Sequence, residues 1–314
     1  MDDTSYSLSK TEYQKFVKKY FMDIIEQLKT IKEKNNISEL YEIYDYFFRP
    51  SVSVIPIKIR KGEKIVRVRP NDKKWKHLKN TKDLFCPPPH RTIIQRANIG
   101  GFPMFYAAKF IADSNAPLSR AIVLYETSKF ARDTNSEGIQ RLTYSVWEVT
   151  EEMTLILVPF GENYDKLNIK LKELEVQWRE LINRVNFEED KLKICDFLSA
   201  EFSKDNSDYF FTSHYNHFAC NILSREHDGV AYPTVKLEGD GLNVAIKPES
   251  AANKLRLIGA SECYLIKRED KMILANVCEA KFLKNGKTKF IKRDDFKLKS
   301  KNWEALMSGL KFIN

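Results

Sequence analysis

The sequence of 314 residues has no apolar run long enough to cross a membrane and no paired cysteine motif. A bilayer-spanning helix needs about 20 consecutive apolar residues. The start, MDDTSYSLSK, also lacks the basic stretch and apolar core of a secretory signal. We therefore expect a cytoplasmic protein that makes no membrane contact. The five cysteines are odd in number and none stands in a C-x-x-C pair, so reduced structural thiols are expected.

Motifs that define several enzyme and nucleic-acid-binding classes are missing as well. No G-x-S-x-G element occurs, which argues against a Ser-His-Asp hydrolase. His214, His217 and Cys220 have ligand-like spacing, but no second pair completes a tetrahedral site, so no metal is expected. The net charge of +9 would suit nucleic acid. Acidic residues are interleaved with the basic ones, however, and no helix-turn-helix or zinc-finger spacing occurs, so nucleic acid is a less favoured partner.

The N-terminal part of the chain has the pattern of two amphipathic helices. Apolar residues recur at three- and four-residue steps over residues 10–33. Asn36 with Glu39 three residues on has the form of a capping box, which predicts a second helix that ends before the next proline. We expect residues 1–50 to form a helical extension and residues 51–314 to form the main domain. The extension could pack on that domain, form a homo-oligomer or bind a partner.

After residue 50 the sequence alternates between strand-like and helix-like segments. Short runs rich in β-branched residues predict strands, and longer runs with a three- to four-residue apolar period predict helices. Residues 213–223 are expected to form a helix with Phe218 and Ile222 facing inward. Because strand runs flank a block of helices, the expected fold class is α+β. The expected strands are 52–59, 63–70, 120–126, 141–149, 153–159, 229–237, 242–248, 255–267 and 272–283, and the other expected helices are 164–185 and 189–203.

Polar residues gather where turns or strand ends adjoin apolar strands, the context in which ligand pockets form. These residues are Arg67 and Arg69 in IVRVRP, Arg96, Asn98 and Tyr106 in QRANIGGFPMFY, Glu126 in AIVLYET, Asp228, Tyr232 and Thr234 in DGVAYPTV, and Asn243 after it. Guanidinium groups can grip a pyrophosphate bidentately, and a carboxylate can stabilise a developing positive charge. A flat aromatic ring can stack on a planar ligand.

In this order the segments resemble the pattern of the RES-domain family. That pattern has an Arg-x-Arg strand, a Gly-Arg-x-Asn turn leading to Pro-x-x-Tyr, a glutamate, and an Asp-Gly-hydrophobic-x-Tyr-Pro-Ser strand. The likeness covers residues 60–250. In two departures from the pattern, Gln95 precedes the arginine where the family has glycine, and Thr234 stands in place of serine but keeps the hydroxyl.

The resemblance implies a fold like that of ADP-ribosyltransferases, with a split β-sheet core. The helical patterns of the sequence add an N-terminal helical extension and an inserted helical block to this expected architecture. It implies an enzyme that takes NAD as substrate, needs no metal, and cleaves the nicotinamide–ribose bond by hydrolysis, phosphorolysis or ADP-ribosyl transfer to a protein acceptor. Many members resemble toxins held in check by an antitoxin protein. The implied catalytic residues are Arg96, Tyr106, Glu126 and Thr234, and the implied NAD-binding residues are Arg67, Arg69, Asn98 and Asn243.

Several of these residues also have an ordinary structural explanation, and Thr234 is a common residue type in a strand. Arg67 and Arg69 could lie on a solvated strand face, and Tyr106 could be a core aromatic. Glu126 has basic neighbours in the sequence and could form a surface ion pair, which contributes little stability. Two other functions therefore stay open: a basic nucleic-acid-binding protein, and a degenerate family member that binds a partner through its N-terminal helices.

Overall fold

The computed structural model describes residues 24–48, 55–71, 78, 80–109, 116–158, 169–182, 188–204, 208–223, 226–234, 242–269, 271–292, 308 and 312–313. The first part of the helix expected over residues 10–33 lies outside these ranges, as does the end of the strand expected over 229–237. Within the described residues, no helix combines the length and the apolar character needed to cross a bilayer.

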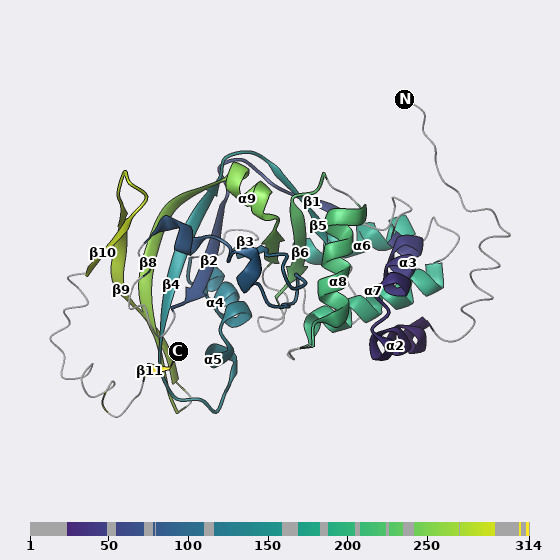
Figure 1. Cartoon of the computed structure of the whole chain (residues 1–314), viewed down its shortest axis with the longest axis horizontal. Coiled ribbons are helices and arrows are strands. Elements are labelled where there is room, and N and C mark those ends of the chain that lie inside the picture. The colour runs from purple at the N-terminus through teal and green to yellow at the C-terminus, as the bar shows by residue number, and fades with distance from the viewer. Residues whose placement is uncertain are drawn as a thin grey trace.

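Ten strands of the described chain form one mixed sheet, and the chain is an α+β protein. Their order is β1-β5-β6-β7-β3-β2-β4-β8-β9-β10, which runs from right to left in Figure 1, and the short β11 pairs with β4. Strands β5 and β6 are parallel, as are β11 and β4, and the other neighbours are antiparallel. The strands are Ile55–Ile59 (β1), Lys64–Pro70 (β2), Phe105–Lys109 (β3), Gly138–Val149 (β4), Met153–Leu157 (β5), Gly229–Pro233 (β6), Leu242–Ile246 (β7), Leu255–Arg268 (β8), Lys271–Phe282 (β9), Thr288–Lys292 (β10) and Phe312–Ile313 (β11).

Helices cover one face of this sheet. Over its centre lie α4 and α5, whose apolar side chains pack with Val66, Val68 and Ala108 of the sheet. The remaining large helices gather at the β5–β6 end (Figure 1), where they share a second apolar cluster with β6 and β7. The helices on this face are α2 (Ile24–Lys34), α3 (Ile37–Phe48), α4 (Ala116–Thr127), α5 (Lys129–Arg132), α6 (Ile169–Ile182), α7 (Glu188–Ser203) and α8 (Phe210–Phe218), which continues into a π-helical turn over Ala219–Leu223.

The other face of the sheet carries a separate apolar core. Phe105 of β3 and Trp147 of β4 belong to it, with ring centroids 5.1 Å apart. Helix α9 (Pro248–Lys254) and the segment 80–91 contribute Ala251 and Leu84 to the same core. That segment contains two short 3-10 turns, Thr81–Leu84 and Pro89–Arg91. The sheet therefore separates two apolar cores. Because successive side chains of a strand point to opposite faces, the position of a residue along its strand decides which core its side chain enters.

The helical nature of the N-terminal part is confirmed. Helix α3 begins after Asn36, whose Oδ1 accepts the N–H of Glu39 at 3.3 Å and whose amide donates to the Glu39 carboxylate at 2.8 Å. The Tyr44 hydroxyl donates to the carbonyl of Phe211 at 3.1 Å, which ties α3 to α8. Helices α2 and α3 share their apolar cluster with α7, α8 and the sheet. The division of the chain at residue 50 stays a prediction.

Two detailed predictions are wrong. The segment 120–126 was expected as a strand but forms most of α4, because a short apolar run has the same composition in a buried helix and in a buried strand. Ile222 was expected to face inward but is 41% exposed, whereas Phe218 is buried as expected. The chain passes into a π-helical turn after Phe218, so a residue four positions on no longer lies on the same face.

Candidate functional site

Glu126 lies on the side of α4 that faces the sheet. Ser119, Ile122 and Val123 precede it and are all buried. Together the four residues occupy positions i, i+3, i+4 and i+7, which share one helix face. Helix α4 contacts β2, β3 and β7. The helical periodicity therefore points the Glu126 carboxylate at the central strands, where the side chain is 14% exposed.

Two hydrogen-bond donors and one cation, each from a separate element, hold the Glu126 carboxylate. Arg96 Nε lies 3.2 Å from Oε1, the Tyr232 hydroxyl donates to Oε1 at 3.1 Å, and the Asn243 amide donates to Oε2 at 3.3 Å. Tyr232 and Asn243 stand opposite each other on β6 and β7, so their side chains share a sheet face. The side chain of Arg96 is only 8% exposed. The Arg96–Glu126 ion pair is therefore largely buried. It is not the surface ion pair that was the structural alternative for Glu126.

The guanidinium of Arg96 is also held by the end of α7. Its two terminal nitrogens donate to the carbonyl of Phe202 and, at 3.1 Å, to that of Lys204. Carbonyls at a helix C-terminus lack partners within the helix and carry its negative dipole end, so a cation there is favourable. The Tyr209 ring lies 5.6 Å from the guanidinium carbon. Since all three nitrogens face protein oxygens, the geometry makes Arg96 a positioning residue for Glu126.

The turn that carries Arg96 is fixed by Tyr106, Asn98 and Asn216. The Tyr106 hydroxyl accepts the N–H of Ala97 at 2.9 Å and donates to Asn98 Oδ1 at 2.8 Å. The Asn98 amide donates to two carbonyls of the same turn at 2.8 and 3.1 Å, and Asn216 of α8 donates to the carbonyl of Ala97. Burial raises the pKa of Tyr106 well above its usual value, so the hydroxyl stays protonated and able to donate.

Tyr106 shares the sheet face of Tyr232 and Asn243. It lies opposite Ala245 in the β3–β7 pairing, in which Asn243 lies opposite Ala108. Residues two apart on a strand point to the same side. The structure therefore brings Tyr106, Glu126, Arg96, Asn98 and Asn243 together from three segments of the chain: 96–106, helix α4 and strand β7.

Arg67 and Arg69 lie on the other side of the sheet. On β2 they alternate in phase with Ile65, which belongs to the far core, whereas Val66 packs under α4. One terminal nitrogen of Arg67 donates to the carbonyl of Tyr106 at 2.8 Å, and the other donates to a carbonyl of the segment 80–91 at 3.3 Å. Arg69 donates to a second carbonyl of that segment. The structure does not bring these two arginines to Glu126.

Burial explains the electrostatic state of Arg67. Its guanidinium carbon lies 4.9 Å from the centroid of the Phe105 ring. Burial lowers the pKa of Arg67 to about 10 because the charged form is desolvated. The group is still a cation near neutral pH. Its hydrogen bonds to the carbonyls of Tyr106 and Phe85 link β3 to the loop on the far face. Arg67 thus ties the sheet to this loop through main-chain carbonyls.

Thr234 and Asn243 each carry a buried oxygen that has no hydrogen-bond partner among the described residues. Thr234 follows the end of β6 and is 3% exposed, and Asn243 is 2% exposed. The atoms concerned are Thr234 Oγ1 and Asn243 Oδ1. A buried polar atom left unpaired costs about 1–3 kcal/mol. These two oxygens are therefore candidates for contact with a ligand.

No protein-family model matches the chain, and no curated protein matches it either. The central element of the site is a carboxylate held at a fixed position beside an aromatic side chain, on a sheet face covered by helices. Such a carboxylate can stabilise positive charge that develops on a bound molecule.

The structure adds residues that the sequence patterns did not single out for a role. Tyr232 was noted only as part of its segment, yet it contacts Glu126 directly. Burial and the neighbouring Glu126 charge raise its pKa, so it acts as a neutral hydroxyl donor. The sequence did hold a signal for this contact: Tyr232 stands two residues before Thr234, and residues two apart on a strand point to the same face. Asn216 sits in an aromatic-rich helix, and nothing in its local sequence indicated its contact with the turn at Ala97.

The histidines once considered as metal ligands pack against aromatic rings instead. The His214 ring nitrogen is 2.9 Å from the Tyr41 hydroxyl, and the His217 ring contacts Phe102 with centroids 4.7 Å apart. Burial lowers the pKa of both histidines. Over the described part of the chain, no group of three or more His, Cys, Asp or Glu residues is arranged to hold a metal ion.

Proposed function

We propose that the protein is an enzyme that consumes NAD by cleaving the bond between nicotinamide and ribose. The observation that carries the proposal is the partly buried Glu126 carboxylate, which Arg96, Tyr232 and Asn243 hold on the sheet face that also bears Tyr106. The segments that supply these groups are those whose motifs resemble the RES-domain family.

The reaction needs a fixed negative charge near the sugar. As the bond to nicotinamide breaks, the ribose carbon develops oxocarbenium character. A carboxylate that is already positioned, and largely screened from water, stabilises that charge without reorganisation. In the proposal Glu126 has this role, with 14% of its side chain exposed. Nicotinamide leaves with the bonding electron pair, and the acceptor oxygen of water, phosphate or a protein side chain forms the new bond and releases its proton to solvent.

The remaining residues suit the binding of the two ends of that bond. The Tyr106 hydroxyl is engaged by the turn, so its ring is the part that would contact the planar nicotinamide. Thr234 Oγ1 and Asn243 Oδ1 are buried without a partner in the described chain. Amide and hydroxyl groups of nicotinamide and ribose could satisfy both oxygens. Arg96 has a positioning role in this scheme, and Arg67 and Arg69 support the fold from the far face.

The likeness to the RES-domain family extends the proposal to architecture and biology. It supports an ADP-ribosyltransferase-like arrangement within the α+β fold, and a cytoplasmic toxin controlled by an antitoxin protein. Three reactions remain within the proposal: hydrolysis, phosphorolysis and ADP-ribosyl transfer. They differ in product, because they yield ADP-ribose, its phosphate ester and a modified protein, respectively.

The test is to incubate the purified protein with NAD and to quantify nicotinamide by chromatography, with and without phosphate and candidate protein acceptors. We expect nicotinamide release by the wild type. Glu126→Gln keeps the shape of the side chain but removes the charge, and should lower the rate about 10²–10³-fold. Glu152→Gln is the matched control, because Glu152 pairs with Lys58 at the surface with 46% of its side chain exposed. It should react like the wild type.

The proposal fails if the wild type neither consumes NAD under these conditions nor binds it in a ligand-observed NMR titration. It also fails if Glu126→Gln and Glu152→Gln retain equal activity, since the carboxylate would then have no part in the reaction. A protein that instead binds DNA or RNA with an affinity that falls steeply with salt would support the basic nucleic-acid-binding alternative.

A further inference from the structure

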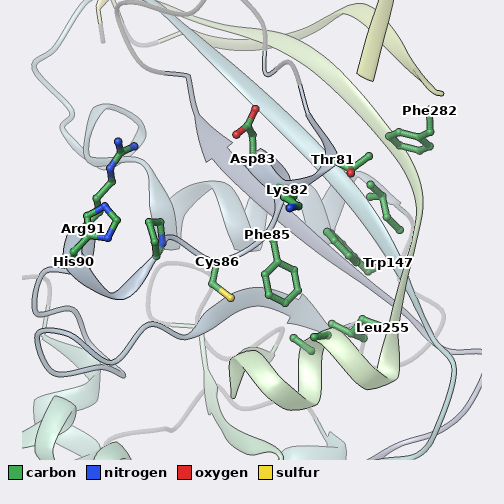
Figure 2. Close-up of a pocket in the computed structure, with 14 residues that line it drawn as sticks. Thr81, Lys82, Asp83, Phe85, Cys86, His90, Arg91, Trp147, Leu255 and Phe282 are labelled. Carbon is green, nitrogen blue, oxygen red and sulfur yellow. The ribbon is translucent and has the colours of Figure 1, made fainter. Parts of the chain in front are cut away.

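A pocket lies on the far face of the sheet, away from Glu126. It has a volume of about 900 Å³ and is bounded by the segment 81–91, by β4 and β8, and by helix α9. Small-molecule sites usually measure about 300–1,000 Å³. Figure 2 shows Phe85 and Trp147 next to each other near its middle, His90 and Arg91 at one end, and Phe282 at the other.

The inner wall of the pocket is apolar and partly aromatic. The ring centroids of Phe85 and Trp147 are 6.0 Å apart, and Leu255, Leu257 and Phe282 complete this surface. The indole N–H of Trp147 already donates to a strand hydroxyl at 2.9 Å. The wall therefore offers rings and aliphatic groups, which favour a planar apolar body.

The rim of the pocket carries positive charge. Lys82 and Arg91 are exposed cations of its lining, and His90 lies beside Arg91 (Figure 2). None of the three forms an ion pair with a described residue. Among the described lining residues only Asp83 is acidic, and its carboxylate accepts the N–H of Asn80 at 3.0 Å. An anionic group at this rim would meet unpaired positive charge in partly apolar surroundings, where charged hydrogen bonds are strong.

The wall is held in place by contacts from the sheet. Arg69 donates to the carbonyl of Asp83, and Arg67 donates to that of Phe85 at 3.3 Å. The guanidinium of Arg67 also stacks on Phe105 beneath the loop. Because these contacts exist before any ligand arrives, less ordering is required on binding.

From these features we propose that the pocket is a second binding site, specific for a small amphipathic anion with a planar aromatic body and one carboxylate or phosphate group. The aromatic body packs between Phe85, Trp147 and Leu255, and the anionic group is attracted by the exposed cations of the lining, Arg91 and Lys82. The proposal is independent of the reaction assigned to Glu126, because the pocket opens on the opposite face of the sheet.

Binding can be measured by calorimetry on the full chain with three probes: 2-naphthoate, 2-naphthyl phosphate and the neutral 2-acetylnaphthalene. We expect one site per chain for at least one anion and at least about tenfold weaker binding of the neutral probe. Comparing the two anions distinguishes a carboxylate ligand from a phosphate ester.

Cys86 lines the pocket and is half-buried, whereas the other four cysteines, all in the described chain, are buried. The bound anion should slow its alkylation by iodoacetamide.

Variants at exposed positions locate the site without disturbing the core. Arg91→Glu and Lys82→Glu should each weaken anion binding about tenfold, and Ala252→Trp should abolish protection of Cys86 by filling the pocket. Lys271→Glu is the control, because Lys271 is exposed at the end of β9 opposite to Phe282. The proposal is overturned if neither anion binds, if the neutral probe binds equally well, or if binding is the same in the Arg91, Lys82 and Lys271 variants.

Discussion

The ion pair between Arg96 and Glu126 makes the most direct test of how the site is built. Replacing Arg96 with methionine keeps much of the side-chain volume and removes the charge. The change leaves the Glu126 carboxylate, 14% exposed, without its cation, and it frees the carbonyls of Phe202 and Lys204. The variant therefore probes the contact that joins the turn, helix α4 and the end of α7.

The expected size of the effect follows from burial. Removing one partner of a buried ion pair costs about 3–5 kcal/mol, because the other charge is left desolvated. Glu126→Gln also leaves a desolvated charge, that of Arg96, but the guanidinium keeps the carbonyls of Phe202 and Lys204 and the carboxamide oxygen can still accept from Tyr232, so the cost should be smaller, about 1–3 kcal/mol. In the double variant no charge is left unpaired. We therefore expect Arg96→Met with Glu126→Gln to recover about 1–3 kcal/mol relative to the sum of the single changes.

The measurement is the free energy of unfolding in urea for the wild type, both single variants and the double variant. Arg179→Met is the control, because Arg179 pairs with Glu175 one turn away on α6 at 3.1 Å, with 29% and 20% of the side chains exposed. Pairs of this kind contribute about 0.5 kcal/mol. If Arg96→Met costs no more than Arg179→Met, or if the double-variant cycle shows no coupling, the buried pair does not organise the site as described.

Two other predictions concern pH and packing. Burial lowers the pKa of His214 from 6.5. Below about pH 6.5 the folded state therefore binds fewer protons than the unfolded state, and the free energy of unfolding falls as the pH drops. His214→Gln should reduce the loss of this free energy between about pH 7 and pH 5, measured by urea unfolding. A Cβ on Gly229 would lie 2.1 Å from the Ala245 carbonyl oxygen, whereas one on Gly259 would meet nothing within 4 Å. Gly229→Ala should therefore cost about 3 kcal/mol, against a change within about 0.5 kcal/mol for Gly259→Ala, and equal melting temperatures would contradict this.

Secondary structure was predictable where one local signal was decisive. The Asn36–Glu39 capping box marked the start of α3, and the hydrogen bonds between these residues are present. Strand alternation located β2, and the long helical repeat located α7 (Glu188–Ser203) within one residue of the expected start. The segment 120–126 was misassigned because β-branched residues in a buried helix and in a buried strand satisfy the same composition.

The sequence identified most residues of the candidate site but not how they are arranged in space. Tyr106, Glu126 and Asn243 were identified from their motifs, and they lie on one side of the sheet. Arg67 was grouped with them as well, yet the parity of β2 places it in the other core. Alternation along a strand separates two sets of side chains, but it does not say which set faces a given helix.

The sequence by itself determined the α+β class, most helices and strands, and the polar residues that stand beside turns. Tertiary structure alone decided that Glu126 meets Arg96, Tyr232 and Asn243, and that a separate pocket forms beneath the segment 81–91. The physical reason is that local propensity and periodicity act over a few residues. Contacts between segments more than one hundred positions apart, such as Tyr232 with Glu126, depend on strand order and on which face each helix covers.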